Sequence, residues 1–146
     1  MSATAAEKIL ARASGKEKVH PGEIVYPEPD LIIMHDLHAH LFLRDLWQMG
    51  LRKLWKPERV MVAIDHRVPA PNLKSTEIHR EIRDWIKRYE IGHFYDIGDS
   101  GITHILQVER GLARPGTFIV TKDVHSPNAG AVGSLAIPLV YDIPVF

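Results

Sequence analysis

Cysteine is absent from the 146 residues of this sequence. Its absence excludes disulfides, a thiol nucleophile, zinc–thiolate sites and any iron–sulfur cluster held by thiolates of this chain. No apolar stretch approaches the length of about 20 residues that spans a membrane, and no signal-peptide layout is present, so we expect a soluble cytoplasmic protein without a membrane partner. Basic residues (18) and acidic residues (18) balance without a basic stripe. A nucleic-acid partner is therefore not expected.

The composition is that of a globular protein with a core. Apolar residues make up 45% of the chain and charged residues 25%. A chain of this length is typical of one domain, which we predict to cover residues 1–146. Histidine stands out, with nine residues against three tryptophans and four tyrosines.

Short apolar runs alternate with segments of helical periodicity. Four runs are predicted as strands, within residues 31–36, 59–66, 92–101 and 117–125, and four segments as helices, within residues 2–17, 40–50, 75–90 and 102–116. The segment 75–90 has the clearest apolar face, with Ser75 as its expected cap. Continuously apolar strands that alternate with helices are typical of a parallel sheet covered on both faces. We therefore predict the α/β class, a three-layer α/β/α fold with a mainly parallel sheet of four or five strands.

Each predicted strand ends in a carboxylate, and three of the four strands also end in a histidine. The residues are His35 and Asp36, Asp65 and His66, Asp96, and Asp123 with His125. A single Asp at a strand end is commonly a helix cap or a turn residue. Ligands of parallel sheets, however, bind beyond the carboxyl ends of the strands, where all four endings should meet. Carboxylates that orient imidazoles as acids or bases are what proton transfer requires, so a catalytic site is predicted at this edge.

Three further residues extend the predicted site. His104 lies on the first turn of a predicted helix, where backbone N–H groups suit a carboxylate ligand. Arg67 and Ser126 follow the second and fourth strands and are candidates to bind a carboxylate substrate, with ordinary loop residues as the alternative. Three more histidines are interpreted as surface residues: His20, His79 and His93.

The stretch HDLHAH adds two histidines close to the end of the first strand. Clustered imidazoles are typical ligands of a single divalent metal ion, so His38 and His40 are candidate metal ligands, with neighbouring segments contributing more imidazoles. The remaining candidate ligands for such a site are His66, His104 and His125. A solvent-exposed pair of histidines at a helix start is the alternative.

Several longer motifs follow one another from about Ala6 to Ile137. They read AEKILARASGKEKVHPGEIV, HDL, IDHRVPAP, DIGDSGITHILQVERGLARPGTFIV and DVHSPNAGAVGSLAI. In order and spacing they resemble the aconitase family, most closely its 3-isopropylmalate dehydratase and homoaconitase large subunits. The resemblance implies an α/β/α domain, the first of three in such a subunit. It also implies descent from a hydro-lyase that removes and re-adds water on a tricarboxylate or substituted malate.

The resemblance further implies roles for single residues. Asp65 and His66 match the family's active-site pair after the second strand. His104 matches the histidine of its GI-x-H segment, and Asp123 and His125 match the two ends of its DSH triplet. In the family these groups surround a substrate bound to a [4Fe–4S] cluster.

Departures from the family pattern concern the chemistry. Val124 stands where the triplet has a serine, while His38 and His40 stand where the family usually has Thr and a small residue or Pro. The cluster-binding cysteines and a catalytic serine on a swivelling domain belong to parts of the large subunit that this sequence does not contain. We therefore expect no turnover by this chain alone. We expect either partners that supply those domains or a homo-oligomer.

Three interpretations stay open. The first is a hydro-lyase domain that binds a small di- or tricarboxylate and depends on missing partners. The second is an enzyme or binding protein with a single divalent metal ion as Lewis acid in place of the cluster. The third is a non-catalytic scaffold or oligomer-forming module, natural or engineered. The final segment, LAIPLVYDIPVF, is apolar and strand-like, and we expect it to cover sheet surface that missing domains would hide.

Overall fold

The computed structural model describes residues 3–139, so most of the predicted apolar cover, residues 140–146, lies outside the described part. The elements in chain order are α1 (Ala5–Ala13), β1 (Leu31–His35), α2 (Ala39–Gln48), the 3-10 helix η1 (Pro57–Arg59), β2 (Val60–Ala63), α3 (Leu73–Tyr89), β3 (His93–Tyr95), α4 (Thr103–Glu109), β4 (Phe118–Thr121), the 3-10 helix η2 (Ser126–Val132) and β5 (Leu135–Pro138). Over the described part of the chain, no helix combines the length and apolar character that crossing a membrane requires.

The five strands form one parallel sheet in the order β3-β2-β1-β4-β5. In register, Ile33 of β1 pairs with Met61 of β2, and Leu31 pairs with Ile119 of β4. The chain builds outward from β1 to β3 and then returns to the other side of β1, so the strand order reverses between β1 and β4. In such sheets the crevice at this switch point is where ligands bind.

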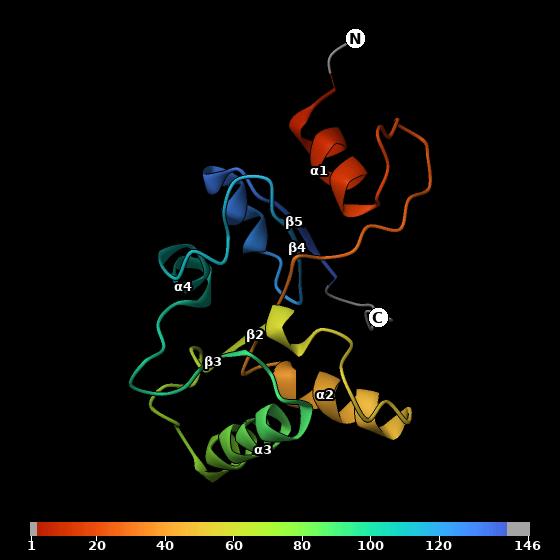
Figure 1. The fold of residues 1–146 in the computed structure, drawn as a ribbon. Coiled ribbons are helices and arrows are strands. Elements are labelled where there is room, and N and C mark those ends of the chain that lie inside the picture. Colours follow the sequence, from red (N-terminus) through yellow and green to blue (C-terminus); the bar gives the residue numbers. More distant parts are fainter. Residues whose placement is uncertain (1–2, 140–146) are drawn as a thin grey trace.

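Helices cover both faces of the sheet, which confirms the predicted three-layer α/β/α fold (Figure 1). On one face Met34 and Val62 pack against Leu43 of α2 and Ile82 of α3. The opposite face, which includes Ile33, packs against α4 and η2. Residues adjacent in a strand point to opposite faces. Because both faces of this sheet are covered, the central strands β1, β2 and β4 are apolar on both sides.

The helix α3 starts earlier than predicted, and its cap is Asn72 rather than Ser75. The Asn72 side-chain oxygen accepts the backbone N–H of Ser75 at 2.9 Å, while Ser75 itself is buried in the first turn. Asn and Ser are equally good N-caps. The choice of Ser75 as cap was therefore wrong, because both residues satisfy the local rule and the packing of the helix selects between them.

On the face of the sheet that packs against α2 and α3, β4 and β5 are only partly covered. Phe118, Val120 and Ile137 line an apolar groove of about 560 Å³ there, together with Phe42 of α2. None of the predicted Asp and His site residues lines this groove. The groove lies on a face of the sheet, whereas the predicted site lies at its carboxyl edge.

Ile82 and Leu73 lie on the same helix, but Ile82 is fully buried and Leu73 is 83% exposed. We expect Ile82→Ala to lower the free energy of unfolding by about 2–5 kcal/mol, because it removes buried methylene groups and leaves a cavity. Leu73→Ala is the matched control, with an expected change below about 0.5 kcal/mol. Urea unfolding followed by tryptophan fluorescence measures both. Equal unfolding midpoints for the two variants would contradict this core.

Candidate functional site

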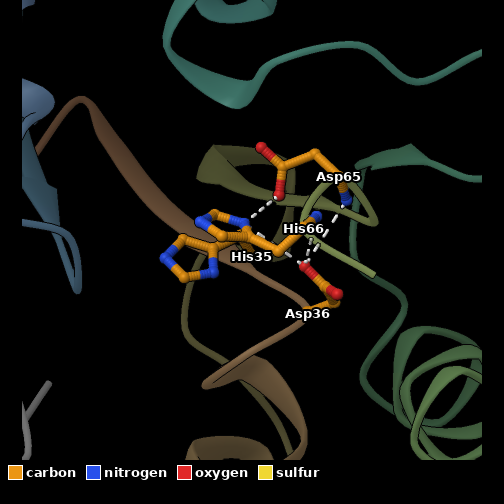
Figure 2. A group of neighbouring side chains, drawn as sticks. All are labelled: His35, Asp36, Asp65 and His66. Atoms are coloured by element: carbon orange, nitrogen blue, oxygen red, sulfur yellow. Dashed lines mark hydrogen bonds and ion pairs between the residues drawn. The ribbon is translucent and has the colours of Figure 1, made fainter. Parts of the chain in front are cut away.

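The Asp36 carboxylate, directly after β1, organises the turn that follows β2. It is fully buried and accepts the backbone N–H groups of His66 at 3.1 Å and Arg67 at 3.0 Å, and that of Asp65 at a longer 3.4 Å. A buried carboxylate is costly unless such donors satisfy it. The ends of β1 and β2 are thereby joined into one unit, which Figure 2 shows with Asp36 below the turn.

His79 of α3 completes the surroundings of Asp36. Its Nε2 lies 3.7 Å from Asp36 Oδ2, and its side chain is only 2% exposed. The interpretation of His79 as a surface residue was therefore wrong, whereas His20 is exposed and His93 is half-buried. A signal was present in the sequence, because residue 79 lies three positions before Ile82 on the apolar face of its helix.

Asp65 connects the turn after β2 to the start of α4. Its Oδ2 accepts the Thr103 backbone N–H at 2.8 Å and the Thr103 hydroxyl at 2.5 Å, while its Oδ1 lies 2.6 Å from His66 Nδ1. Burial raises the pKa of Asp65, but hydrogen bonds from Thr103 and then His66 outweigh it and hold the pKa below the usual value. An ionised Asp65 thus fixes both the His66 ring and the N-terminus of α4. Thr103 was not recognised from the sequence.

Asp123, after β4, is contacted by three histidines from separate parts of the chain. Its Oδ1 lies 3.0 Å from His125 Nδ1 and 3.5 Å from His104 Nε2, and its Oδ2 lies 3.1 Å from His35 Nε2. Burial raises the pKa of Asp123, but the His125 backbone N–H and the nearby imidazoles outweigh it and lower the pKa. β1, β4 and α4 therefore converge on one ionised carboxylate at the switch point.

His35, one of the predicted strand-end residues, lies between the Asp65–His66 pair and Asp123. Its ring stacks on that of His66 with centroids 4.2 Å apart (Figure 2), while its Nε2 faces Asp123. Although the contact with Asp123 is short, it is too poorly aligned for a hydrogen bond, and Nε2 has no hydrogen-bond partner among the described residues. Burial, followed by repulsion from His66 and His38, lowers the pKa of His35 to about 4. At neutral pH His35 is an uncharged imidazole.

Two sets of side chains could each hold a metal ion, with ligand atoms within 4.8 Å of one another. The first set is His35, Asp36, Asp65 and His66, and the second is His104, Asp123 and His125. Among the described residues, His38 and His40 belong to neither set. His38 precedes α2, and its ring meets that of His35 edge-on with the centroids 4.9 Å apart. His40 is buried in the first turn of α2. The metal role of His38 and His40 stays a prediction.

Three other predicted residues belong to neither of these two sets. Asp96 forms two hydrogen bonds with Arg83 of α3, at 2.6 and 2.8 Å. The Ser126 hydroxyl is buried and lies 2.9 Å from Thr121 Oγ1, so it stabilises the turn after β4. Arg67 lies on the turn held by Asp36. The structure thus brings three of the four strand ends together, and the substrate-binding roles of Arg67 and Ser126 stay predictions.

Comparison with known proteins agrees with this arrangement. The family model of the aconitase family (aconitate hydratase) matches residues 7–140. The chain belongs to the aconitase family. It is 39% identical to a 3-isopropylmalate dehydratase large subunit from Heliobacterium modesticaldum and 38% identical to one from Aquifex aeolicus, each over 136 residues. These matches cover 93% of this chain but 32% and 31% of the two relatives. The chain thus spans about a third of the length of the curated relatives it matches.

The cluster implied by membership of the aconitase family does not fit the side chains of this chain. A [4Fe–4S] cluster is held by cysteine thiolates, and this sequence has no cysteine. The edge offers imidazole and carboxylate groups instead. This aconitase-family chain therefore supplies residues that could surround a substrate, but no ligand set for the cluster.

Asp36→Asn tests the role of the buried carboxylate. The amide has one acceptor oxygen in place of two, so at least one of the three backbone donors loses its partner. We expect the free energy of unfolding to fall by about 1–3 kcal/mol and the amide resonances of residues 65–67 to move. Asp84→Asn, at an exposed position of α3, is the control. Unchanged resonances at 65–67 would contradict the role of Asp36.

His35 predicts a pH dependence of stability. Its pKa of about 4 in the folded chain lies below the unfolded value of about 6.5, so the unfolded state binds more protons between these values. The contribution of the neutral His35 to the free energy of unfolding is therefore complete above about pH 6.5, and it falls by about 3 kcal/mol as the pH drops to about 4. Urea unfolding against pH should show a steeper loss for the unmodified chain than for His35→Gln. Parallel curves would contradict the buried neutral state, and His20→Gln serves as control.

Proposed function

We propose that this chain is the domain of a 3-isopropylmalate dehydratase-type hydro-lyase that forms one wall of the active site. Its carboxyl edge would take part in the removal and return of water on a substituted malate. The observation that carries the proposal is the convergence of His35, His104 and His125 on Asp123 at the switch point of the sheet. A helix cap needs one carboxylate and backbone donors, whereas three imidazoles lie around this carboxylate, two of them from distant segments.

Dehydration of a hydroxy acid needs one group that accepts a proton from carbon and another that protonates the departing hydroxyl. The edge supplies two carboxylate–imidazole pairs, Asp65 with His66 and Asp123 with His104 or His125. In each pair the carboxylate is mostly buried and the imidazole is more exposed, up to 78% for His125. The carboxylates thus orient the rings and stabilise their charged form, while the rings reach the side from which a substrate would approach.

The substrate carboxylates would be held by groups on the two turns that frame this edge. Arg67 supplies a cation on the turn after β2, and η2 follows the turn after β4. Val124 is exposed between Asp123 and His125 and offers no hydroxyl at this edge. The Lewis acid that binds the substrate hydroxyl in the family would come from segments that carry thiolates. We therefore propose that turnover requires those segments and that this chain alone only binds the acid.

The binding of a malate-type acid can be tested on the full chain in EDTA, so that metal ions do not contribute. We expect 3-isopropylmalate at millimolar concentration to shift amide resonances within residues 101–104 and 123–130. An equimolar monocarboxylate of the same carbon skeleton should shift them less. Arg67→Gln should weaken the response, while Arg80→Gln, at an exposed site of α3, should not.

The outcome that would overturn the proposal is the absence of shifts at both segments in a chain that gives the spectrum of a folded protein. Equal responses to the dicarboxylate and the monocarboxylate would count against a substrate site as well. A chain that responds to neither acid but self-associates would favour the scaffold interpretation.

A further inference from the structure

We propose that this chain binds one divalent transition-metal ion on Asp123, His104 and His125, and that His35 holds the far oxygen of the Asp123 carboxylate. The hydro-lyase proposal requires no metal ion on these three residues, so the site goes beyond that function. It also differs from the pair His38 and His40, which the sequence suggested.

The spacing of the three ligand atoms suits a single ion. Bonds of about 2.0–2.1 Å in a tetrahedral site place neighbouring ligand atoms about 3.3 Å apart. Asp123 Oδ1 lies 3.0 Å from His125 Nδ1 and 3.5 Å from His104 Nε2, on either side of that value. All three residues offer ligand atoms within 4.8 Å of one another. Small side-chain rotations therefore suffice to place one ion among them.

A buried and unpartnered nitrogen points to the same carboxylate. His35 Nε2 is 3.1 Å from Asp123 Oδ2 in a side chain that is 2% exposed, yet it makes no hydrogen bond among the described residues. The Leu37 N–H approaches the other ring nitrogen, Nδ1, at 3.4 Å, so Nε2 carries the proton of the neutral ring. An ion on Oδ1 would rotate the carboxylate and allow Oδ2 to accept a hydrogen bond from that Nε2–H group. Carboxylates that bind metal ions commonly accept such a second hydrogen bond.

The other histidine–carboxylate set is less suited to a metal ion, because its oxygens are already used. Asp36 accepts three backbone N–H groups, and Asp65 accepts two bonds from Thr103 and lies 2.6 Å from His66. An ion on these oxygens would compete with bonds that hold the turn after β2 and the start of α4. Asp123 Oδ1 also accepts the backbone N–H of the adjacent His125, at 2.6 Å, but that bond joins no second element of the fold. Asp123 Oδ2 faces His35 Nε2 without a well-aligned hydrogen bond among the described residues.

The donor set indicates the class of metal ion. Two imidazoles and one carboxylate suit Zn²⁺, Co²⁺ or Fe²⁺, and three protein ligands leave a position for water or a substrate oxygen. The exposure of His125 leaves this side of the site accessible from solvent. The absence of thiolates disfavours ions that require soft sulfur ligands.

The test is a titration of the EDTA-stripped and dialysed full chain with Co²⁺ and with Zn²⁺. We expect one ion per chain by mass spectrometry and calorimetry, with visible Co²⁺ bands of four- or five-coordinate intensity. His125→Ala and Asp123→Asn should each weaken binding at least about 10-fold, and His35→Gln should weaken it by about 10-fold with unchanged stoichiometry. His20→Ala is the control outside the site and should bind like the unmodified chain.

Several outcomes would overturn the site: no binding at micromolar Co²⁺ or Zn²⁺, equal weakening by His20→Ala, or full binding by His125→Ala. Folding does not confuse the result, because His125 is exposed and Asp123→Asn keeps the size of the side chain. An amide spectrum of each variant checks this directly. The acid titration in EDTA is independent of this experiment, so failure of the metal site leaves the hydro-lyase proposal standing, and the reverse also holds.

Discussion

The burial of Asp36 is the constraint on which the rest of the edge depends. A carboxylate without solvent must be surrounded by donors, and here the donors are backbone N–H groups of residues 65–67. That requirement sets the path of the chain after β2 and so positions Asp65. Asp65 in turn accepts the N–H of Thr103 and holds the start of α4, which carries His104 towards Asp123. One buried side chain thus influences the geometry of residues up to about 90 positions away in the sequence.

The carboxylates at this edge differ in the groups that their oxygens contact. Asp36 and Asp65 accept hydrogen bonds from backbone N–H groups and from the Thr103 hydroxyl, and they are therefore primarily positioning groups. Asp123 accepts one backbone N–H, that of His125 at 2.6 Å, and otherwise faces side-chain nitrogens at 3.0 to 3.5 Å. The contrast explains why the same edge supports two proposals. A proton-transfer site needs imidazoles oriented by carboxylates, and a metal site needs a carboxylate oxygen with imidazole nitrogens at ligand spacing. Asp123 meets both requirements.

Membership of the aconitase family and the absence of cysteine together define what this chain contributes. It carries the fold and the histidine–carboxylate edge, while the thiolates that hold an iron–sulfur cluster are not among its residues. Its relatives are about three times as long. The apolar groove over β4 and β5 is a second surface of the domain, separate from the edge and free of its histidines.

The sequence by itself determined the layers, the parallel sheet and the meeting of strand ends at one edge. Apolar periodicity is a local property of the chain, and the alternation of strands with helices favours parallel strands whose ends share one edge. It also indicated Asp65, His66, His104, Asp123 and His125. Only the tertiary structure decided which polar groups face one another. Asp96 accepts hydrogen bonds from Arg83, and His79 is buried beside Asp36. Among the described residues, His38 and His40 belong to neither ligand set. These outcomes depend on distances between side chains of different elements, and such distances follow from packing rather than from any sequence period.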